Sequence, residues 1–327
     1  MPKPYKHLSQ YERDLLSIFK SRGHTIREIA HGLKRDPGTI SRELKRNVPP
    51  VKTGYYMAHK AHERAVNRAV SSRTHQRIRN DKARKYVRRR IKHGWSPELI
   101  AGRLKKQHPG LSISHEAIYQ WIYSDARDLI PFLVRSHRNR KRRGYSKRHK
   151  KTHIPERVSI KERPQEVLLR QQPGHWETDT AVSSQSLSAL QVSVERKTRL
   201  TKLARLPRKG ACSMSRALTK CLRPFPDWFR ISITYDNGSE NSRHSRTNKI
   251  LGTRSYFCEP FHSWERGTNE NTIGLVRRFF PKKTNFAKVS KNKISAVERW
   301  LNHRPRKCLN FSTPLEVANS LGVALRG

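Results

Sequence analysis

The sequence predicts a multidomain protein in which all-α helix-turn-helix modules precede an α/β domain. Helix-capping patterns recur twice in the N-terminal half, in residues 8–47 and 94–123. Strand-like runs and one amphipathic helix follow one another in residues 175–236. A block rich in Lys and Arg separates the two halves. With 327 residues, the chain is long enough for two or three domains of ordinary size.

The charge of the chain indicates an anionic partner. Seventy-one Lys and Arg against 25 Asp and Glu give a formal net charge of +46. Residues 1–170 hold 43 of the basic and 14 of the acidic side chains, so both halves are basic. So large a field of one sign needs an abundant polyanion, and nucleic acid is the first choice. A basic RNA-binding structural protein would share this composition.

Other classes of protein fit the sequence less well. No apolar stretch approaches the roughly 20 residues that a transmembrane helix requires, and no N-terminal apolar segment marks the chain for export. The cysteines form no C-x-x-C pair, so we expect free thiols in a reducing compartment rather than zinc or disulfide sites. They are Cys212, Cys221, Cys258 and Cys308.

Residues 8–47 have the pattern of three short helices. The first two begin with capping boxes, in which a Ser or Thr oxygen and a Glu three residues later satisfy orphan N–H groups. These pairs are Ser9 with Glu12 and Thr25 with Glu28. Asp36 and Pro37 open the third helix, since proline at the first helical position loses no hydrogen bond.

The third helix, Thr39 to Lys45, is basic on its outer faces and places Ile40 and Leu44 on its buried side. Two short helices joined by a tight turn, the second of them basic, indicate a helix-turn-helix that binds DNA. A helical bundle with a solvated face is the alternative. We therefore expect a DNA-binding domain over residues 1–50. Its expected contacts are Thr39, Ser41, Arg42 and Arg46.

Residues 51–92 are expected to form a basic helical connector, because alanines recur in them near helical spacing. Its basic side either touches phosphates or is only solvated. Residues 93–130 repeat the capping design, with Ser96 as cap and Pro97 in the first turn. We interpret them as a second helix-turn-helix-like module. Its second helix, residues 114–123, is rich in aromatic side chains, so packing or dimerisation competes with DNA binding.

Residues 131–170 contain the most basic stretch. Between Arg135 and Lys151 there are ten Lys or Arg and no acid. Such a run cannot bury a core, so we interpret 131–170 as a linker that holds the DNA backbone. A localisation signal is the weaker alternative. The expected phosphate contacts are Arg138, Arg140, Lys141, Arg142 and Arg143.

Residues 171–327 change in character and predict an α/β domain. Strand-like segments cover residues 175–182, 187–195 and 200–206, a helix covers 213–222, and a fourth strand covers 231–236. Three strands, a helix and a further strand in this order fit a domain of the ribonuclease-H type.

Three acids in this half stand where a site can form. Asp179 is expected to close the first strand and Asp236 the fourth, and sites form at the strand ends of an open α/β sheet. Glu270 opens a stretch with helical periodicity. The three acids are separated by 57 and 34 residues. An isolated Asp before Asn-Gly usually serves only to form a turn. Three acids placed on two strands and one helix, however, together predict a three-carboxylate metal site.

Clustered carboxylates of this kind suit phosphodiester chemistry. They repel one another unless a cation binds, and Mg²⁺ prefers hard oxygen ligands. Two Mg²⁺ ions roughly 3.5–4 Å apart activate a nucleophile and neutralise a leaving oxygen; Mn²⁺ is the other candidate. Arg277 lies seven residues after Glu270 and returns to nearly the same helix face. It either holds a DNA phosphate or is a basic residue on a solvated helix.

Six motifs then occur in an order that is specific to one family. They cover residues 39–47, 94–98, 174–179, 235–238, 266–271 and 302–307. With them, nearly the whole chain resembles the "thirty" (IS30-type) family of bacterial insertion-sequence transposases, whose nuclease core is of the Asp-Asp-Glu kind. The resemblance implies a retroviral-integrase-type, ribonuclease-H-like catalytic core over residues 171–327. It implies Asp179, Asp236 and Glu270 as catalytic metal ligands, and Arg277 matches the basic position that the family places after the Glu.

The chain also departs from the family's usual residues. These departures are Thr178, Asn241 and Cys258, of which the first two flank the expected triad.

The resemblance implies a DNA transposase that binds the terminal inverted repeats of an insertion sequence. Such an enzyme cuts with water and joins the 3′-OH ends to target DNA, using two divalent metal ions per site. We expect double-stranded DNA and further copies of the chain as partners, no membrane, and a bacterial cytoplasmic location at the nucleoid. A catalytically inactive DNA-binding regulator derived from such a transposase is the alternative, and the three intact acids favour the enzyme.

Overall fold

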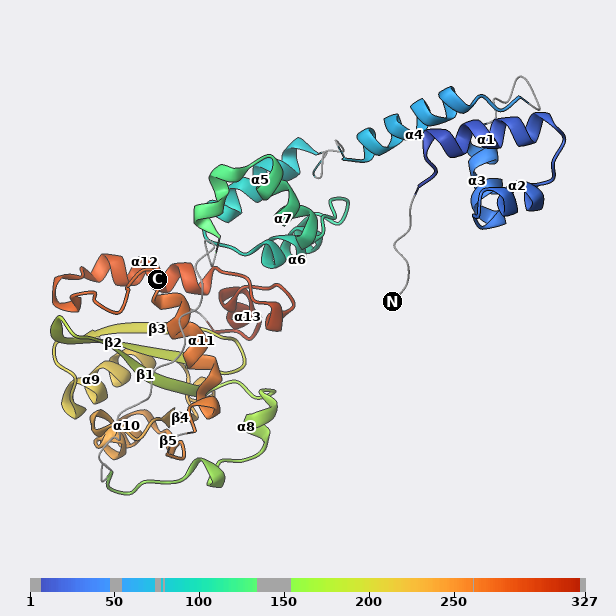
Figure 1. The fold of residues 1–327 in the computed structure, drawn as a ribbon. Helices are drawn as coiled ribbons and strands as arrows, with labels where there is room; N and C mark the ends of the chain where they lie inside the picture. The colour runs from blue at the N-terminus through green and yellow to red at the C-terminus, as the bar shows by residue number, and fades with distance from the viewer. Residues whose placement is uncertain are drawn as a thin grey trace. The chain divides into compact units, whose positions relative to one another are not determined.

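The chain divides into two compact units, residues 1–79 and 80–327. The structure, a computed structural model, describes residues 7–47, 55–73, 78, 80–133, 154–260 and 262–323 (Figure 1). The finer boundaries that we predict after residues 50, 92, 130 and 170 stay predictions. No helix in these ranges is long and apolar enough to cross a membrane.

The first unit is all-α, as predicted. Its helices are α1 (Gln10–Ser21), α2 (Ile26–Gly32), α3 (Pro37–Asn47) and α4 (Ala58–Arg73). Both capping boxes form: the Ser9 and Thr25 side chains accept from the N–H groups of Glu12 and Glu28, whose carboxylates accept from the two cap N–H groups.

The core of this unit combines apolar packing with one buried ion pair. Leu16, Ile29 and Ile40 are fully buried, as the helical spacing predicts. Arg13 Nε donates to Glu43 Oε1 across 2.7 Å, with both side chains about nine-tenths buried or more. Local patterns do not reveal this pair, because its partners belong to different helices. Their mutual neutralisation makes the burial of each charge tolerable.

The second unit begins with three helices. They are α5 (Asp81–Lys92), α6 (Pro97–Gln107) and α7 (His115–Ser124). Ser96 caps α6 as predicted, its hydroxyl accepting from the N–H of Leu99. In α7, Ile118, Trp121 and Ile122 are buried, so part of its aromatic face serves packing. Its proposed role as a second DNA-binding helix stays a prediction.

These helices contact the C-terminal part of the same unit. Arg103 Nη1 on α6 donates to Glu316 Oε2 across 2.8 Å, in α13 (Pro314–Ser320). Trp300 Nε1 donates to the carbonyl of His93 across 2.8 Å. Trp300 belongs to α12 (Lys291–Asn302).

A five-stranded sheet with the order β3-β2-β1-β4-β5 forms the centre of the unit. Its strands are β1 (His175–Ser183), β2 (Ser186–Glu195), β3 (Thr201–Leu206), β4 (Ser232–Tyr235) and β5 (Arg254–Phe257). β1, β2 and β3 are antiparallel neighbours, whereas β4 is parallel to β1 and β5 to β4. This strand order and orientation is the ribonuclease-H fold, which confirms the predicted fold class.

Helices cover both faces of the sheet (Figure 1). α9 (Ala211–Leu222) and α10 (His244–Leu251) pack on one face, with Trp176 and Ile233 in their shared core. α11 (Gly267–Val276) and α12 pack on the other face, over Val192 and Leu190. A short helix, α8 (Glu166–Leu169), precedes β1.

The entry into β1 depends on a glycine. Gly174 has φ +100°, a conformation that L side chains rarely adopt. A Cβ atom there would lie 2.6 Å from the carbonyl oxygen of Trp228. The carbonyl of Gly174 in turn accepts from the N–H of Ile231 across 2.7 Å, which ties the start of β1 to the start of β4.

Candidate active site

The register of the sheet brings Asp179 and Asp236 together. Glu177 pairs with Thr234 between the parallel strands β1 and β4. Since side chains alternate between the faces of a strand, two further residues on each strand place Asp179 and Asp236 side by side on the same face. Trp176 and Tyr235 point into the core under α9 and α10, so the two aspartates belong to the opposite face, which α11 covers.

One boundary differs from the sequence prediction. Asp179 does not close β1, because the strand continues to Ser183 in pairing with β2. Only the parallel pairing with β4 ends at Glu177. Asp236 follows directly after the last residue of β4, as predicted. Asp179 therefore lies just beyond the last residue of β1 that pairs with β4.

A single guanidinium bridges the two aspartates. Arg266 Nη1 lies 3.0 Å from Asp179 Oδ2, and Arg266 Nη2 lies 3.8 Å from Asp236 Oδ2. The Arg266 side chain is 13% exposed. Burial lowers the pKa of its guanidinium, but the charges of Asp179 and Asp236 outweigh it and raise that pKa above its ordinary value. Arg266 belongs to the motif over residues 266–271, but nothing in its spacing along the chain indicates that it bridges the two aspartates.

The carboxylate of Asp236 is destabilised in its charged form. Burial and the charge of Asp179 raise its pKa, while Arg266 lowers it. Asn241 Nδ2 donates to Asp236 Oδ1 across 2.6 Å, and the N–H of Gly238 donates to the same oxygen across 3.2 Å. These donors orient one oxygen and leave the other directed at Arg266.

A fourth carboxylate lies close to this pair. Glu240 is 3% exposed and its charge raises the pKa of Asp236. Glu240 Oε1 accepts from Thr180 Oγ1 across 3.0 Å and lies 2.9 Å from Lys209 Nζ. Glu240 was not selected in the sequence analysis above, because an isolated acid five residues after a strand carries no local signal. The contacts with Thr180 and Lys209 hold its carboxylate in place.

The helix that carries Glu270 is anchored on the sheet by buried polar contacts. The N–H of Asn269 donates to Glu177 Oε2 across 3.0 Å, and Asn269 Nδ2 donates to the carbonyl of Val192 across 3.1 Å. Glu177 is completely buried and pairs with Arg196. This network places the first turn of α11 over β1 and β2. Glu270 itself is exposed.

The structure thus brings two of the three predicted acids together. Across the described ranges, no group of three His, Cys, Asp or Glu side chains lies close enough to hold a metal ion. The expected three-carboxylate cluster is therefore present as an aspartate pair, with Glu270 one turn along α11 from the arginine that bridges the pair. The role of Glu270 as third ligand stays a proposal.

The donors of this site fit a divalent cation. Two carboxylates that share one buried cationic group have oxygens within reach of a single positive charge, and hard oxygens are the ligands that Mg²⁺ and Mn²⁺ prefer. The mutual repulsion of Asp179 and Asp236 is of the kind that a bound cation relieves.

Arg277 follows the last residue of α11 rather than standing inside the helix. Its Nη2 donates to the carbonyl of Val182 across 2.9 Å, so the side chain reaches the end of β1. Burial lowers the pKa of its guanidinium. Its predicted contact with a DNA phosphate stays a prediction.

The predicted DNA contacts on α3 have the exposure that their role needs. Ser41, Arg42 and Arg46 are exposed and Thr39 is half-buried, whereas Ile40 and Leu44 are buried. The predicted phosphate contacts of the linker lie outside the described residues; they are Arg138, Arg140, Lys141, Arg142 and Arg143.

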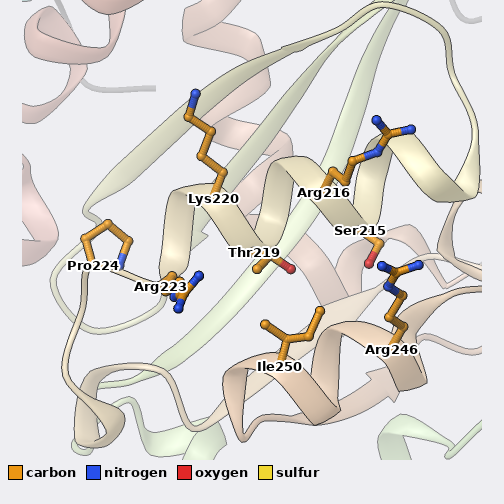
Figure 2. Close-up of a pocket in the computed structure, with 8 residues that line it drawn as sticks. All are labelled: Ser215, Arg216, Thr219, Lys220, Arg223, Pro224, Arg246 and Ile250. Atoms are coloured by element: carbon orange, nitrogen blue, oxygen red, sulfur yellow. The ribbon is translucent and has the colours of Figure 1, made fainter.

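A basic groove of about 450 Å³ lies between α9 and α10. Its lining includes Arg216 and Lys220 on α9, Arg223 directly after that helix, and Arg246 and Ile250 on α10 (Figure 2). All four cations are exposed, so water solvates them without a burial penalty. The groove contributes to the basic surface of the unit, as its net charge leads one to expect.

Comparison with known proteins agrees with this geometry. A family model described as a helix-turn-helix domain matches residues 4–47. The chain is 38% identical over 332 residues to "Transposase InsI for insertion sequence element IS30A" of Escherichia coli (strain K12), covering 98% of this chain and 85% of that protein. It is 37% identical to the "Transposase for insertion sequence element IS1086" of Cupriavidus metallidurans, covering 96% and 94%.

The chain belongs to the IS30-type family of insertion-sequence transposases. It is accordingly an enzyme of DNA transposition with an N-terminal DNA-binding helix-turn-helix, as the resemblance implied. Among solved structures, the catalytic core domain of BIV integrase is similar with a TM-score of 0.37 and 16% identity, covering 46% of this transposase and 95% of that chain.

Of the three departures from the family's usual residues, Asn241 contacts the site through its side chain. Asn241 holds Asp236, as described above. The Thr178 hydroxyl accepts from Ser193 Oγ across 2.9 Å, which adds a bond between β1 and β2. Cys258 is buried, and its N–H donates to the carbonyl of Tyr235 across 3.0 Å.

Proposed function

We propose that this transposase binds the terminal inverted repeats of its own insertion sequence, cuts the DNA at their ends, and joins the 3′-OH ends to target DNA. Asp179, Asp236 and Glu270 are the metal ligands of this proposal. Its main support is the shared guanidinium of Arg266, because two aspartates held around one cationic group are arranged for a cation. We propose two Mg²⁺ ions, or Mn²⁺ in their place.

Each part of the chain has its own task in this proposal. Bound divalent ions would activate the attacking oxygen and neutralise the leaving oxygen of the phosphodiester. Asn241 and Gly238 orient Asp236, and the Glu177–Asn269 bond holds the helix that carries Glu270. Arg266 keeps the aspartates together until the ions bind. The exposed residues of α3 recognise the DNA ends.

The proposal includes assembly on DNA. Both ends of an element must be cut and joined to one target, so we propose that copies of the chain act together on double-stranded DNA. We place this activity at the nucleoid in the bacterial cytoplasm, where that DNA lies.

The alternative is a DNA-binding regulator that has lost its activity. The observation in its favour is the exposed Glu270, which does not complete a three-group cluster with the aspartates. The two candidates differ in one requirement: an enzyme needs Glu270 to reach the aspartate pair when cations and DNA bind, and a regulator does not.

One experiment tests the proposal. Purified full-length protein is mixed with DNA that carries the element's own ends, in Mg²⁺ or in EDTA, and the products are separated on a denaturing gel. We expect cuts at the ends in Mg²⁺ alone, with binding in both buffers. Binding without any cut in Mg²⁺ or Mn²⁺ would leave the regulator as the better account.

A further inference from the structure

The groove between α9 and α10 (Figure 2) contributes no residue to the candidate active site. A smaller pocket of about 280 Å³ continues it, since Ser215, Arg216 and Arg246 line both. We call the two together the α9–α10 groove. Five exposed cations line it, and they are Arg216, Lys220, Arg223, Arg243 and Arg246.

The two helices of this groove have no acidic side chains. Among the α-helices in the described part of the chain, only α9 and α10 contain neither Asp nor Glu. The sequence around them is free of acids over residues 207–226 and 241–258. The helix α12, by contrast, carries Glu298, which pairs with Lys202. The groove is therefore more uniformly positive than the other helical surfaces of this basic chain.

No carboxylate neutralises the groove. In the ranges that the structure describes, none of its five cations forms an ion pair with an acid. Two acids contact the helices or their connectors, but both have other partners. Glu240 lies 2.9 Å from Lys209, which precedes α9. Glu156 accepts from Ser245 Oγ on α10 across 2.6 Å, and neither acid lines the groove.

The cations also repel one another. Arg216 and Lys220 are one turn apart on α9, and Arg223 follows after nearly another turn. Like charges at this spacing destabilise a helix. The positive side chains of α10 line the same groove and add to this repulsion. A bound polyanion would relieve it, because it brings negative charge to both helices at once.

One end of the groove gains further positive potential from the helices themselves. Cys212, in the first turn of α9, and Arg243, the N-cap of α10, line this end. Neither helix has a side-chain cap or an acid in its first turn. The positive ends of two helix dipoles therefore add to the charges of Arg243 and Arg246. Anions bind favourably at such an end.

The shape of the groove limits which part of a nucleic acid it contacts. A helix that recognises bases enters the major groove of DNA, whereas α9 and α10 lie side by side with a hollow between them (Figure 2). The buried hydroxyls of Ser215 and Thr247 lie 2.9 Å apart and tie the two helices together. A hollow of this kind accommodates the projecting sugar-phosphate backbone and not the base edges, and phosphate contacts carry no sequence information.

We propose that the α9–α10 groove binds the phosphate backbone of duplex DNA without regard to its sequence. The inference rests on the proposed function, which makes duplex DNA the partner of the chain. The groove would give the unit that carries Asp179 and Asp236 its own contact with DNA, while α3 recognises the element's ends from the other compact unit.

The first test compares two double variants, each of which removes one lysine and one arginine charge. Lys220→Gln with Arg246→Gln changes the groove on both helices. Lys291→Gln with Arg299→Gln is the matched control, because both residues are exposed on α12, which covers the other face of the sheet. Binding of the full-length protein to a duplex of unrelated sequence is measured in EDTA at several salt concentrations, so that no cleavage is needed.

The groove variant should bind this duplex more weakly than the control does. Its log K against log [salt] slope should be flatter by about 0.9 for each lost phosphate contact. The charge-preserving variant Lys220→Arg with Arg246→Lys should keep the slope of wild type. Equal affinities and slopes in the groove variant and the control would overturn the proposal and leave an acidic protein surface as the better occupant.

A native thiol reports where the DNA lies. Cys212 is exposed and lines the groove, whereas Cys308 is exposed and lines neither of its two parts. Saturating unrelated duplex should slow the alkylation of Cys212 by N-ethylmaleimide severalfold relative to that of Cys308, as measured by mass spectrometry of peptides. The groove variant should show less protection of Cys212 at the same occupancy of DNA. An alkylation rate of Cys212 that DNA leaves unchanged in wild type would contradict the proposal.

Thermal unfolding without DNA separates binding from folding. The substituted cations are exposed and make no ion pair, so the groove variant should melt at the temperature of the control or above it. If it melts well below the control, its weak binding reflects a damaged fold, and the protection of Cys212 in wild type then decides the proposal. Cleavage of end DNA by wild type in Mg²⁺ tests the proposed function separately, because none of these assays requires catalysis.

Discussion

Arg266 donates to Asp179 across 3.0 Å and thereby occupies the place between the two aspartates where a divalent cation would be attracted. The arginine and a metal ion are thus alternatives for the same negative charge.

This competition predicts the behaviour of Arg266→Gln. Without the guanidinium, the repulsion between Asp179 and Asp236 is unrelieved, so the metal-free protein should lose about 1.5–3 kcal/mol of stability. Mg²⁺ should then raise the melting temperature more than it does in wild type. Arg157→Gln is the control, since Arg157 lies 3.6 Å from Glu259 at another position. Equal Mg²⁺ shifts in all three proteins would show that Arg266 and the cation do not compete.

Amide replacement of the acids should separate chemistry from binding. Asp179→Asn, Asp236→Asn and Glu270→Gln should each abolish strand cleavage and strand transfer, because one set of metal ions serves both displacements. Binding to end DNA should remain nearly intact, because α3 lies in the other compact unit. A gel assay in Mg²⁺ beside a binding titration of the same preparation measures both. A variant that binds and still cuts at the wild-type rate is not a ligand.

The proposed DNA contact of α3 gives a prediction about sequence preference. Arg42 is exposed on α3, and Arg42→Ala should weaken specific end binding by about 1–3 kcal/mol if the guanidinium contacts a base edge. Lys20→Ala, on α1, is a useful comparison because it removes one charge elsewhere in the same unit. Competition binding with end DNA and unrelated DNA measures the change. Equal weakening on both DNAs would assign Arg42 to the phosphate backbone.

The linker should act on all DNA sequences alike. Neutralising Arg138, Arg140, Lys141, Arg142 and Arg143 together should weaken binding to specific and unrelated DNA by the same factor. Each lost phosphate contact should flatten the log K against log [salt] slope by about 0.9. If the slope of the variant matches that of wild type, the run is solvated and makes no phosphate contact.

Lowering the pH from about 4.5 to about 2 should destabilise the first unit. A hydrogen bond from the Arg35 side chain lowers the pKa of Glu12 to about 2. A lowered pKa means that the stabilisation is present above the unfolded-state value near 4.5 and is lost as the pH falls toward 2. Hydrogen exchange of α1 and α2 amides, corrected for intrinsic rates, should therefore accelerate over this range. Glu12→Gln should flatten the dependence, whereas Asp14→Asn, at an exposed position of α1, should not.

Local chemistry was sufficient to predict most elements that precede Asp236. Capping residues such as Ser9 and Thr25 satisfy N–H groups of their own helices, and alternating apolar residues mark β1 to β4 in the order found. The short strand β5 and the helices α10, α12 and α13 were not predicted. Their conformation depends on packing against residues that are distant in the sequence. Leu251, for example, is buried in a core whose other members lie up to about a hundred residues away in the sequence.

The sequence alone determined the class of protein, and it predicted the three acids and the DNA-contacting helix α3, because charge, caps and motifs are properties of short segments. Tertiary structure decided the rest. The parallel register of β1 and β4 sets Asp179 beside Asp236, and the fold carries Arg266 between them from about 30 residues further along the chain. It also gathers the cations of α9 and α10 around one groove. Electrostatic energy depends on distances in space and on burial, and neither can be read from the spacing of residues along the chain.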